Sequence, residues 1–302
     1  MPHDHHHHVP ADAGDARIAW AVGVNVALTV AQVVGGILSG SLALIADALH
    51  NLSDAVSLII AFVARRIARR PADGRMNFGY GRAEAVAALV NFTTLVLIAL
   101  YLVYEGLWRI ARPEPVEGWL VIWVAGIALA VDLVTAALTW SMSKSSMNIR
   151  AAFLHNLADA LGSVAVIVAG AAVVLWGWTW VDPAVTLLIA GYILWHVRAE
   201  IRPVIRHLML GSPEGLDAEE VARAIEADPD VAGVHHLRLW SIGEHEPALD
   251  AHLVIAPGAW AHADAVKARI RADLGTRFGI RKMTLEIECS AHACATPQRI
   301  GG

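Results

Sequence analysis

The chain contains the stretch Leu49-His50-Asn51-Leu52-Ser53-Asp54-Ala55 and repeats it, with one residue changed, as Leu154-His155-Asn156-Leu157-Ala158-Asp159-Ala160. Both copies lie inside long apolar segments, so His50, Asp54, His155 and Asp159 are predicted to lie within the hydrocarbon of a membrane. A charged side chain at the middle of a membrane helix costs about 2.5–3.5 kcal/mol on insertion scales, and it is rarely found there without a role.

Each copy of this motif has a histidine and an aspartate four residues apart. In a helix these two residues lie on one face, so each copy offers an imidazole beside a carboxylate. Two such faces brought together form a set of two nitrogen and two oxygen ligands, which suits a borderline divalent cation such as zinc. The alternative is a structural hydrogen bond inside a helix bundle. Two copies in the same frame instead favour two helices that meet at an ion site near the middle of the membrane.

The composition is that of a membrane protein with a soluble portion. Of the 302 residues, 56% are hydrophobic and only 17% are charged. Soluble domains have about 45–50% apolar and about 25% charged residues. The N-terminus lacks the basic region of a signal peptide. The net charge of −5 does not indicate nucleic-acid binding, and two cysteines in the polar tail form no disulfide framework.

Six apolar runs are long enough to span a membrane, near residues 16–38, 41–64, 83–108, 119–141, 151–176 and 181–201. Twelve Lys and Arg residues flank one set of span ends, whereas the opposite loops contain only Arg109 and Arg112. Because cytoplasmic loops carry the excess of positive residues, both termini are predicted to lie in the cytoplasm.

After the sixth span, the sequence alternates between helix-like and strand-like segments. Helices are predicted at 217–228 and 262–277, and strands at 234–242, 248–255 and 282–288. This order indicates a small α/β domain with helices on an open sheet. The predicted organisation is a His-rich disordered N-terminus (1–15), a six-span transmembrane domain (16–208), a cytoplasmic metal-binding domain (209–290) and a tail (291–302).

The soluble domain contains further candidate metal ligands. A second metal site is predicted from His235, His252, His262 and Glu288, although surface histidines are also commonly satisfied by water. Strand alternation places His235 and His236 on opposite faces of the sheet.

Three other groups of residues have open interpretations. Cys289, His292 and Cys294 form either a soft-metal site or a plain tail. The N-terminal run of His3, Asp4, His5, His6, His7 and His8 either collects metal or is partly an engineered tag. Asp47 shares a helix face with the first motif but has no counterpart in the second, so we interpret it as a partner of the ligands rather than as a ligand.

Four longer motifs resemble the cation diffusion facilitator family, in particular its bacterial zinc, cadmium and cobalt exporters. They are the second-span run Ser41-Leu42-Ala43-Leu44-Ile45-Ala46-Asp47-Ala48-Leu49-His50-Asn51-Leu52-Ser53-Asp54, Phe78-Gly79-Tyr80-Gly81-Arg82-Ala83-Glu84, Asn148-Ile149-Arg150-Ala151-Ala152, and Val234-His235-His236-Leu237-Arg238-Leu239-Trp240. They occur in the family's order over almost the whole chain.

The resemblance implies a six-helix membrane domain, a ferredoxin-like cytoplasmic domain, a homodimer, and exchange of metal for protons. It maps a transport site onto His50, Asp54, His155 and Asp159, and a dimer-stabilising site onto His235, His252, His262 and Glu288. Two departures from the family pattern stand out. A further metal site in the loop between spans two and three is expected to be missing, because Met76 and Tyr80 replace histidines and leave only Asp73. Arg238 stands where the tail motif usually has a second histidine.

The predicted function is therefore proton-coupled efflux of divalent transition-metal ions from the cytoplasm across a bacterial inner membrane. The expected ions are Zn²⁺, or Cd²⁺, Co²⁺ or Ni²⁺, as bound and transported species, and no separate cofactor is predicted. The expected partners are these ions, protons, the lipid bilayer and a second copy of the chain, but not nucleic acid. A phosphate-binding loop with its lysine is absent, which disfavours an ATP-driven pump. Two alternatives are a membrane metalloenzyme, which needs an open coordination position and a general base, and a metal sensor without transport.

Overall fold

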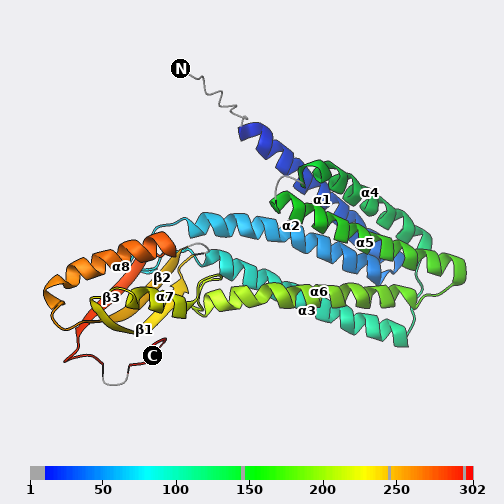
Figure 1. Cartoon of the computed structure of the whole chain (residues 1–302). Coiled ribbons are helices and arrows are strands. Elements are labelled where there is room, and N and C mark those ends of the chain that lie inside the picture. Colours follow the sequence, from blue (N-terminus) through cyan, green and yellow to red (C-terminus); the bar gives the residue numbers. More distant parts are fainter. Residues whose placement is uncertain (1–10, 144–146, 244–245, 295–296, 302) are drawn as a thin grey trace, which may run out of the picture. The chain divides into compact units, whose positions relative to one another are not determined.

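The computed structural model describes residues 11–143, 147–243, 246–294 and 297–301. The helices α1 (Ala11–Ser39), α2 (Leu42–Ala68), α3 (Ala83–Ala111), α4 (Gly118–Ser143), α5 (Met147–Trp176) and α6 (Val181–Leu208) come first. They are followed by α7 (Ala218–Glu226), β1 (Val231–Ser241), β2 (Pro247–Ile255), the 3₁₀ turn η1 (Trp260–His262), α8 (Ala263–Arg277) and β3 (Lys282–Cys289) (Figure 1). The predicted order of six helices, then helix, two strands, helix and strand is confirmed.

The first helix begins earlier than the sequence predicts. α1 starts at Ala11, inside the stretch 1–15 that we expected to be disordered. Alanine is the strongest helix former, and residues 11, 13 and 16 are all alanine. The N-terminal histidine run and residues 244–245, between the first two predicted strands, lie outside the described residues.

The chain forms two compact units. The first, here the helical unit, comprises residues 1–59 and 91–199. The second, here the C-terminal unit, comprises residues 60–90 and 200–302. Within the described residues, five helices are long and apolar enough to cross a membrane, and α1 adds a shorter apolar segment, Val26–Ser39.

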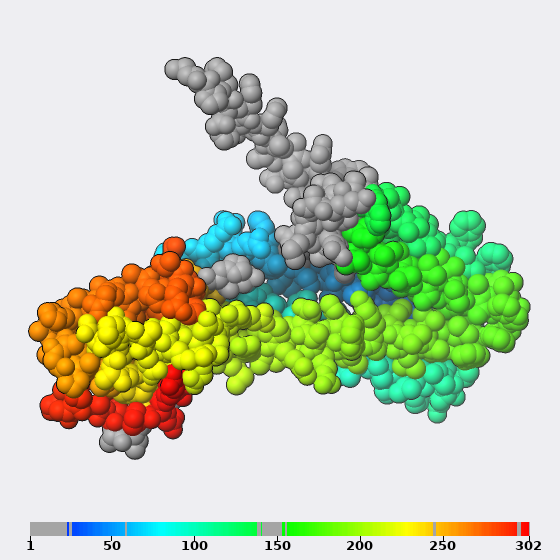
Figure 2. Space-filling model, in the orientation of Figure 1, coloured from blue at the N-terminus to red at the C-terminus, as the bar shows by residue number. Residues whose placement is uncertain are grey.

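Apolar side chains lie on the outside of these helices. On α6, Leu188 is 71% exposed and Trp195 is 69% exposed, and Tyr192 lies between them on the same helix face. Figure 2 shows the outer surface of α6 (lime) as a continuous strip of exposed side chains. An apolar face of this kind is stable in contact with lipid rather than water.

Small residues allow helices of the helical unit to approach closely. A Cβ atom on Gly118 of α4 would lie only 2.5 Å from the carbonyl oxygen of Gly170 on α5. Contacts of this kind between small residues are typical of membrane helix pairs. A buried cluster joins α2, α4, α5 and α6; its members are Ala43, Leu44, Val121, Ala125, Val166, Ala169 and Val185.

The start of α2 is fixed by a carboxylate from α6. Gly40 turns the chain with a φ of +70°, a conformation that glycine adopts without strain. Asp182 of α6 then accepts hydrogen bonds from the Ser41 hydroxyl and from the backbone N–H of Leu42 at 2.8 Å. A carboxylate at a helix N-terminus satisfies free N–H groups and opposes the positive end of the helix dipole. These contacts fix the position of the first motif, which follows two turns later.

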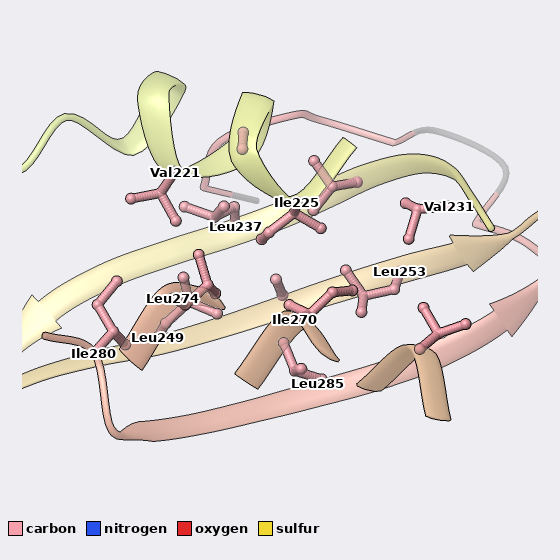
Figure 3. Close-up of a cluster of buried hydrophobic side chains, with 14 of the residues drawn as sticks. Val221, Ile225, Val231, Leu237, Leu249, Leu253, Ile270, Leu274, Ile280 and Leu285 are labelled. Atoms are coloured by element: carbon pink, nitrogen blue, oxygen red, sulfur yellow. The ribbon is translucent and has the colours of Figure 1, made fainter. Parts of the chain in front are cut away.

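In the C-terminal unit, both helices pack on one face of a three-stranded sheet. The strand order is β1-β2-β3, with β1 and β2 antiparallel and β2 and β3 parallel. Figure 3 shows Ile225 of α7 and Ile270 of α8 meeting Leu253 of β2 in one apolar core. Because side chains alternate along a strand, His252 of β2 points to the opposite face, which carries no helix.

Strand β1 departs from this alternation at a bulge. The pairing of β1 with β2 shifts register between His235 and Arg238, and His236 has a φ of +51°. The His235 and His236 rings consequently both lie close to His252, at centroid distances of 5.2 and 5.1 Å. The prediction that His235 and His236 face opposite sides is therefore wrong, because a bulge breaks the two-residue period.

Candidate metal centres

The two copies of the repeated motif meet in the helical unit. His50 and Asp54 lie one turn apart on α2, and Asp159 reaches them from α5. Nε2 of His50 is 3.8 Å from Oδ2 of Asp54 and 3.6 Å from Oδ1 of Asp159. Ligand atoms of the three residues lie within 4.8 Å of one another. Tyr192 of α6 packs edge-on against the His50 ring.

The fourth residue of the predicted set, His155, lies on α5 one turn before Asp159. Its side chain is outside the part of the chain that the structure describes. Residues four apart on a helix share a face, so the backbone places His155 on the same side of α5 as Asp159.

Asp47 belongs to a separate polar network beside this centre. It is buried, and its Oδ2 accepts hydrogen bonds from Gln32 Nε2 at 2.7 Å and from Ser163 Oγ at 3.5 Å. Asn51 donates to the other end of Gln32 at 3.2 Å. Asp47 is not in the ligand group, which agrees with its interpretation as a supporting residue. The network ties α2 to α1 and α5.

A second group of ligand atoms lies on the helix-free face of the C-terminal sheet. It consists of His235, His252, Glu288 and Cys294, whose ligand atoms lie within 4.8 Å of one another. Glu288 is central: its Oε1 is 2.7 Å from Nδ1 of His252, and its Oε2 is 3.2 Å from Nε2 of His235. Burial raises the pKa of Glu288, but hydrogen bonds from His252 and Cys294 outweigh it and leave this pKa below its ordinary value.

A further carboxylate orients His252 in this group. Oε2 of Glu286 lies 3.3 Å from Nε2 of His252, on the opposite side of the ring from Glu288. A ligand histidine commonly donates its other N–H to a carboxylate in this manner, which fixes the ring and raises its basicity. His252 can therefore bind a metal through Nδ1 while Glu286 holds Nε2.

The structure does not bring all predicted ligands of this site together. His262 is exposed at the start of α8 and is not part of the ligand group within the chain. Cys294 takes a place in the group instead, with its Sγ 3.4 Å from Oε1 of Glu288. Burial and the Glu288 carboxylate raise the pKa of the Cys294 thiol.

The predicted set of Cys289, His292 and Cys294 is divided between two places. Cys289 Sγ lies 3.0 Å from Nδ1 of His292, which lowers the pKa of this thiol, whereas Cys294 joins the histidines. His236 is close to the group but directs its Nδ1 to the carbonyl of Gly301 at 3.2 Å. The sequence shows two adjacent histidines at 235 and 236, but it does not show that β1 bulges there and brings His236 close to the group.

Two family comparisons together match almost the whole chain. Residues 18–209 match the cation efflux transmembrane domain, and residues 213–290 match the cation efflux protein cytoplasmic domain. The chain belongs to the cation efflux family. The two matched ranges of this cation efflux protein contain His50, Asp54, His155 and Asp159 and also His235, His252 and Glu288, whereas His292 and Cys294 follow the second range.

Individual relatives resemble this cation efflux protein over almost its full length. Zinc transporter ZitB of Escherichia coli is 34% identical, covering 100% of this chain and 98% of the relative. The metal cation efflux system protein CzcD of Cupriavidus metallidurans is 32% identical, covering 98% and 96%. A cadmium, cobalt and zinc/H(+)-K(+) antiporter of Bacillus subtilis is 34% identical, covering 86% and 85%.

Proposed function

We propose that this cation efflux protein exports zinc, and also cadmium and cobalt, from the cytoplasm in exchange for protons. The transported ion binds to His50, Asp54, His155 and Asp159. The observation that carries this proposal is the convergence of His50, Asp54 and Asp159 from two helices within a membrane-spanning bundle. The names of the relatives support the choice of zinc, cadmium and cobalt.

The ligand chemistry suits ions of intermediate softness. Imidazole favours zinc and similar transition metals, whereas an all-oxygen set favours magnesium, calcium and manganese. Two imidazoles and two carboxylates also fill a tetrahedral shell, which leaves no position for a metal-activated water. This closed shell favours a carrier over a membrane metalloenzyme, so we propose no catalytic activity.

Proton exchange follows from the same four residues. Metal ions bind neutral imidazole and deprotonated carboxylate, so protons and metal compete for the same lone pairs. When the site opens to the cytoplasm, the four side chains release protons and bind metal. When it opens to the other side, protons displace the metal. Rocking of helices around a fixed site near the middle of the membrane is the usual basis of such alternating access.

The C-terminal centre is proposed as a resident metal site that stabilises a homodimer. His235, His252 and Glu288 would hold the ion there, and the chemistry of these donors suits zinc. Exposure of His262 leaves it accessible to a second subunit. Both termini are proposed to lie in the cytoplasm of a bacterium, with the helical unit in the inner membrane.

One assay in proteoliposomes separates the three functions considered. Full-length protein is reconstituted with an internal pH indicator, and zinc is added outside at fixed pH and potential. An exchanger gives a zinc-dependent proton flux, which Asp159→Ala abolishes and Leu161→Ala, a lipid-exposed control on the same helix, retains. A sensor or a metalloenzyme gives zinc binding without this flux, and that result would refute the proposal.

A further inference from the structure

We propose that Cys294 is the fourth ligand of the C-terminal metal site and that it binds as a thiolate supplied by the chain's own tail. The inference rests on the proposed metal site at His235, His252 and Glu288. It adds to this site a sulfur donor that lies beyond the cytoplasmic-domain match, which ends at residue 290.

The four donor atoms lie close to the spacing of a coordination shell. Ligands bound at about 2.0–2.3 Å place the corners of a tetrahedron roughly 3.3–3.8 Å apart. Cys294 Sγ lies 3.4 Å from Oε1 of Glu288 and 4.0 Å from Nδ1 of His252, and Nε2 of His235 lies 3.2 Å from Oε2 of Glu288. Nδ1 of His252 is closer to Oε1 of Glu288, at 2.7 Å, and all four ligand atoms lie within 4.8 Å of one another. Shifts of about 1 Å or less therefore bring all four to one ion.

An unsatisfied buried nitrogen points to a ligand at this place. His235 is only 5% exposed, and its Nε2 makes no hydrogen bond among the described residues. Its contact of 3.2 Å with Oε2 of Glu288 does not have the geometry of a hydrogen bond, and a buried polar atom without a hydrogen bond is costly. A metal ion bound between Cys294, His252 and Glu288 would satisfy this atom.

The tail is built to keep Cys294 at the site. The backbone N–H of Cys294 donates to Oε2 of Glu288 at 3.2 Å. Further along, the backbone N–H groups of His236 and Leu237 donate to the carbonyls of Gln298 and Arg299 at 2.7 and 3.1 Å. The Arg299 guanidinium also pairs with Glu226 of α7 at 2.8 Å. The tail thus adds to the edge of β1 at the bulge, next to the metal-binding histidines.

Cys289 provides a natural comparison. It lies at the end of β3, one residue after Glu288, so strand alternation directs it to the other face of the sheet. Its Sγ contacts His292 rather than the ligand group. The two cysteines therefore share a segment and a chemistry but differ in access to the site.

A thiolate changes which ions the site prefers. Sulfur is a soft donor, so it strengthens binding of cadmium and zinc relative to cobalt and nickel. The thiol releases its proton to water when the metal binds, and no electron is transferred. A soft ion at the site would then add a further link between the tail and the sheet, beside the backbone hydrogen bonds to β1.

Cobalt(II) absorption of the full-length protein in detergent tests the inference. A thiolate ligand gives an intense sulfur-to-cobalt charge-transfer band in the near ultraviolet, which imidazole and carboxylate cannot produce. The transport site has no sulfur, so the band reports only a cysteine. We expect the band in the unaltered protein and in Cys289→Ser, and its complete loss in Cys294→Ser. Zinc should also protect Cys294, but not Cys289, from alkylation measured by mass spectrometry.

The outcomes separate this inference from the proposed site. Cobalt binding that His252→Ala weakens, without any charge-transfer band, would keep the site and overturn thiolate ligation. A band that persists in Cys294→Ser and disappears in Cys289→Ser would also overturn it. Cobalt binding to the C-terminal unit that neither His252→Ala nor His235→Ala changes would refute the metal site itself.

Discussion

Nε2 of His50 lies 3.6 Å from Oδ1 of Asp159, so a side chain from the first copy of the repeated motif contacts a side chain from the second. The two residues lie on α2 and α5, and the buried cluster that contains Leu44 and Val166 holds these helices in place. Neither copy could form a four-ligand shell alone. The repeat and the helix packing together therefore create the centre.

Removal of the Asp159 carboxylate should abolish zinc transport. An outer partner of a metal ligand typically changes affinity by about 10–100-fold, so loss of a direct ligand should reduce zinc flux by more than about tenfold. Asp159→Ala and the control Leu161→Ala are compared by zinc uptake into vesicles at equal protein content. Near-normal flux in Asp159→Ala would contradict the site assignment.

Glu286 should tune the C-terminal metal site without binding the ion. Glu286→Gln keeps the shape of the side chain but weakens its hold on His252 Nε2, so zinc affinity of this site should fall roughly 10–100-fold. Competition with a chelator measures the affinity, in an Asp159→Ala background that removes the transport site. Glu220→Gln, an exposed glutamate on α7, is the control and should leave the affinity unchanged.

The sequence predicts the helices and strands well because the signals for them are local. The six apolar runs, the two-residue alternation of the strands and each copy of the motif depend on residues that are near one another in the chain. His50 and Asp54 lie far from Asp159 in the chain, and the recurrence of the motif is what predicts these residues as one site.

The rest of the C-terminal site depends on tertiary structure. His236 approaches His252 only because β1 bulges, and a single sequence does not show where a bulge occurs. Cys294 enters the ligand group only because the tail returns to the edge of β1. His262 was predicted from its position at a helix start, but the fold of one chain leaves it exposed.

Asp182 should stabilise the helical unit through the start of α2. Asp182→Ala removes the acceptor for Ser41 and for the Leu42 N–H, and loss of a capping acceptor typically costs about 0.5–2 kcal/mol. The melting temperature of the full-length protein in detergent should fall in Asp182→Ala. It should fall less in Asp182→Asn, which keeps one acceptor oxygen. A melting temperature for Asp182→Ala equal to that of the lipid-facing variant Leu188→Ala would contradict this role.

Acid should weaken the C-terminal unit through Asp228. Hydrogen bonds from Arg269 at 2.9 Å hold the pKa of Asp228 below its ordinary value, so folding favours the charged carboxylate. This contribution is complete above the ordinary pKa of aspartate, near about 3.9, and is lost as pH falls through the lower folded value. Arg269→Gln should therefore lower the melting temperature at pH 7 more than at acid pH. Arg271→Gln, on the same helix, serves as the control, and an equal deficit at both pH values would exclude this mechanism.

His50 should set both the ion selectivity and the pH dependence of transport. His50→Asp keeps a ligand but changes two nitrogens and two oxygens to one nitrogen and three oxygens, and it adds a negative charge beside Asp54 and Asp159. An oxygen-rich set accepts manganese more readily, so the zinc-to-manganese uptake ratio should fall by more than total uptake does. The pH profile should also move to lower pH, because a carboxylate has a lower ordinary pKa than an imidazole. Competitive uptake of the two ions into vesicles at two pH values measures both effects, with His207→Asp, outside the ligand group, as a matched control. If His50→Asp keeps both the ratio and the profile of the unaltered protein, His50 does not bind the transported ion.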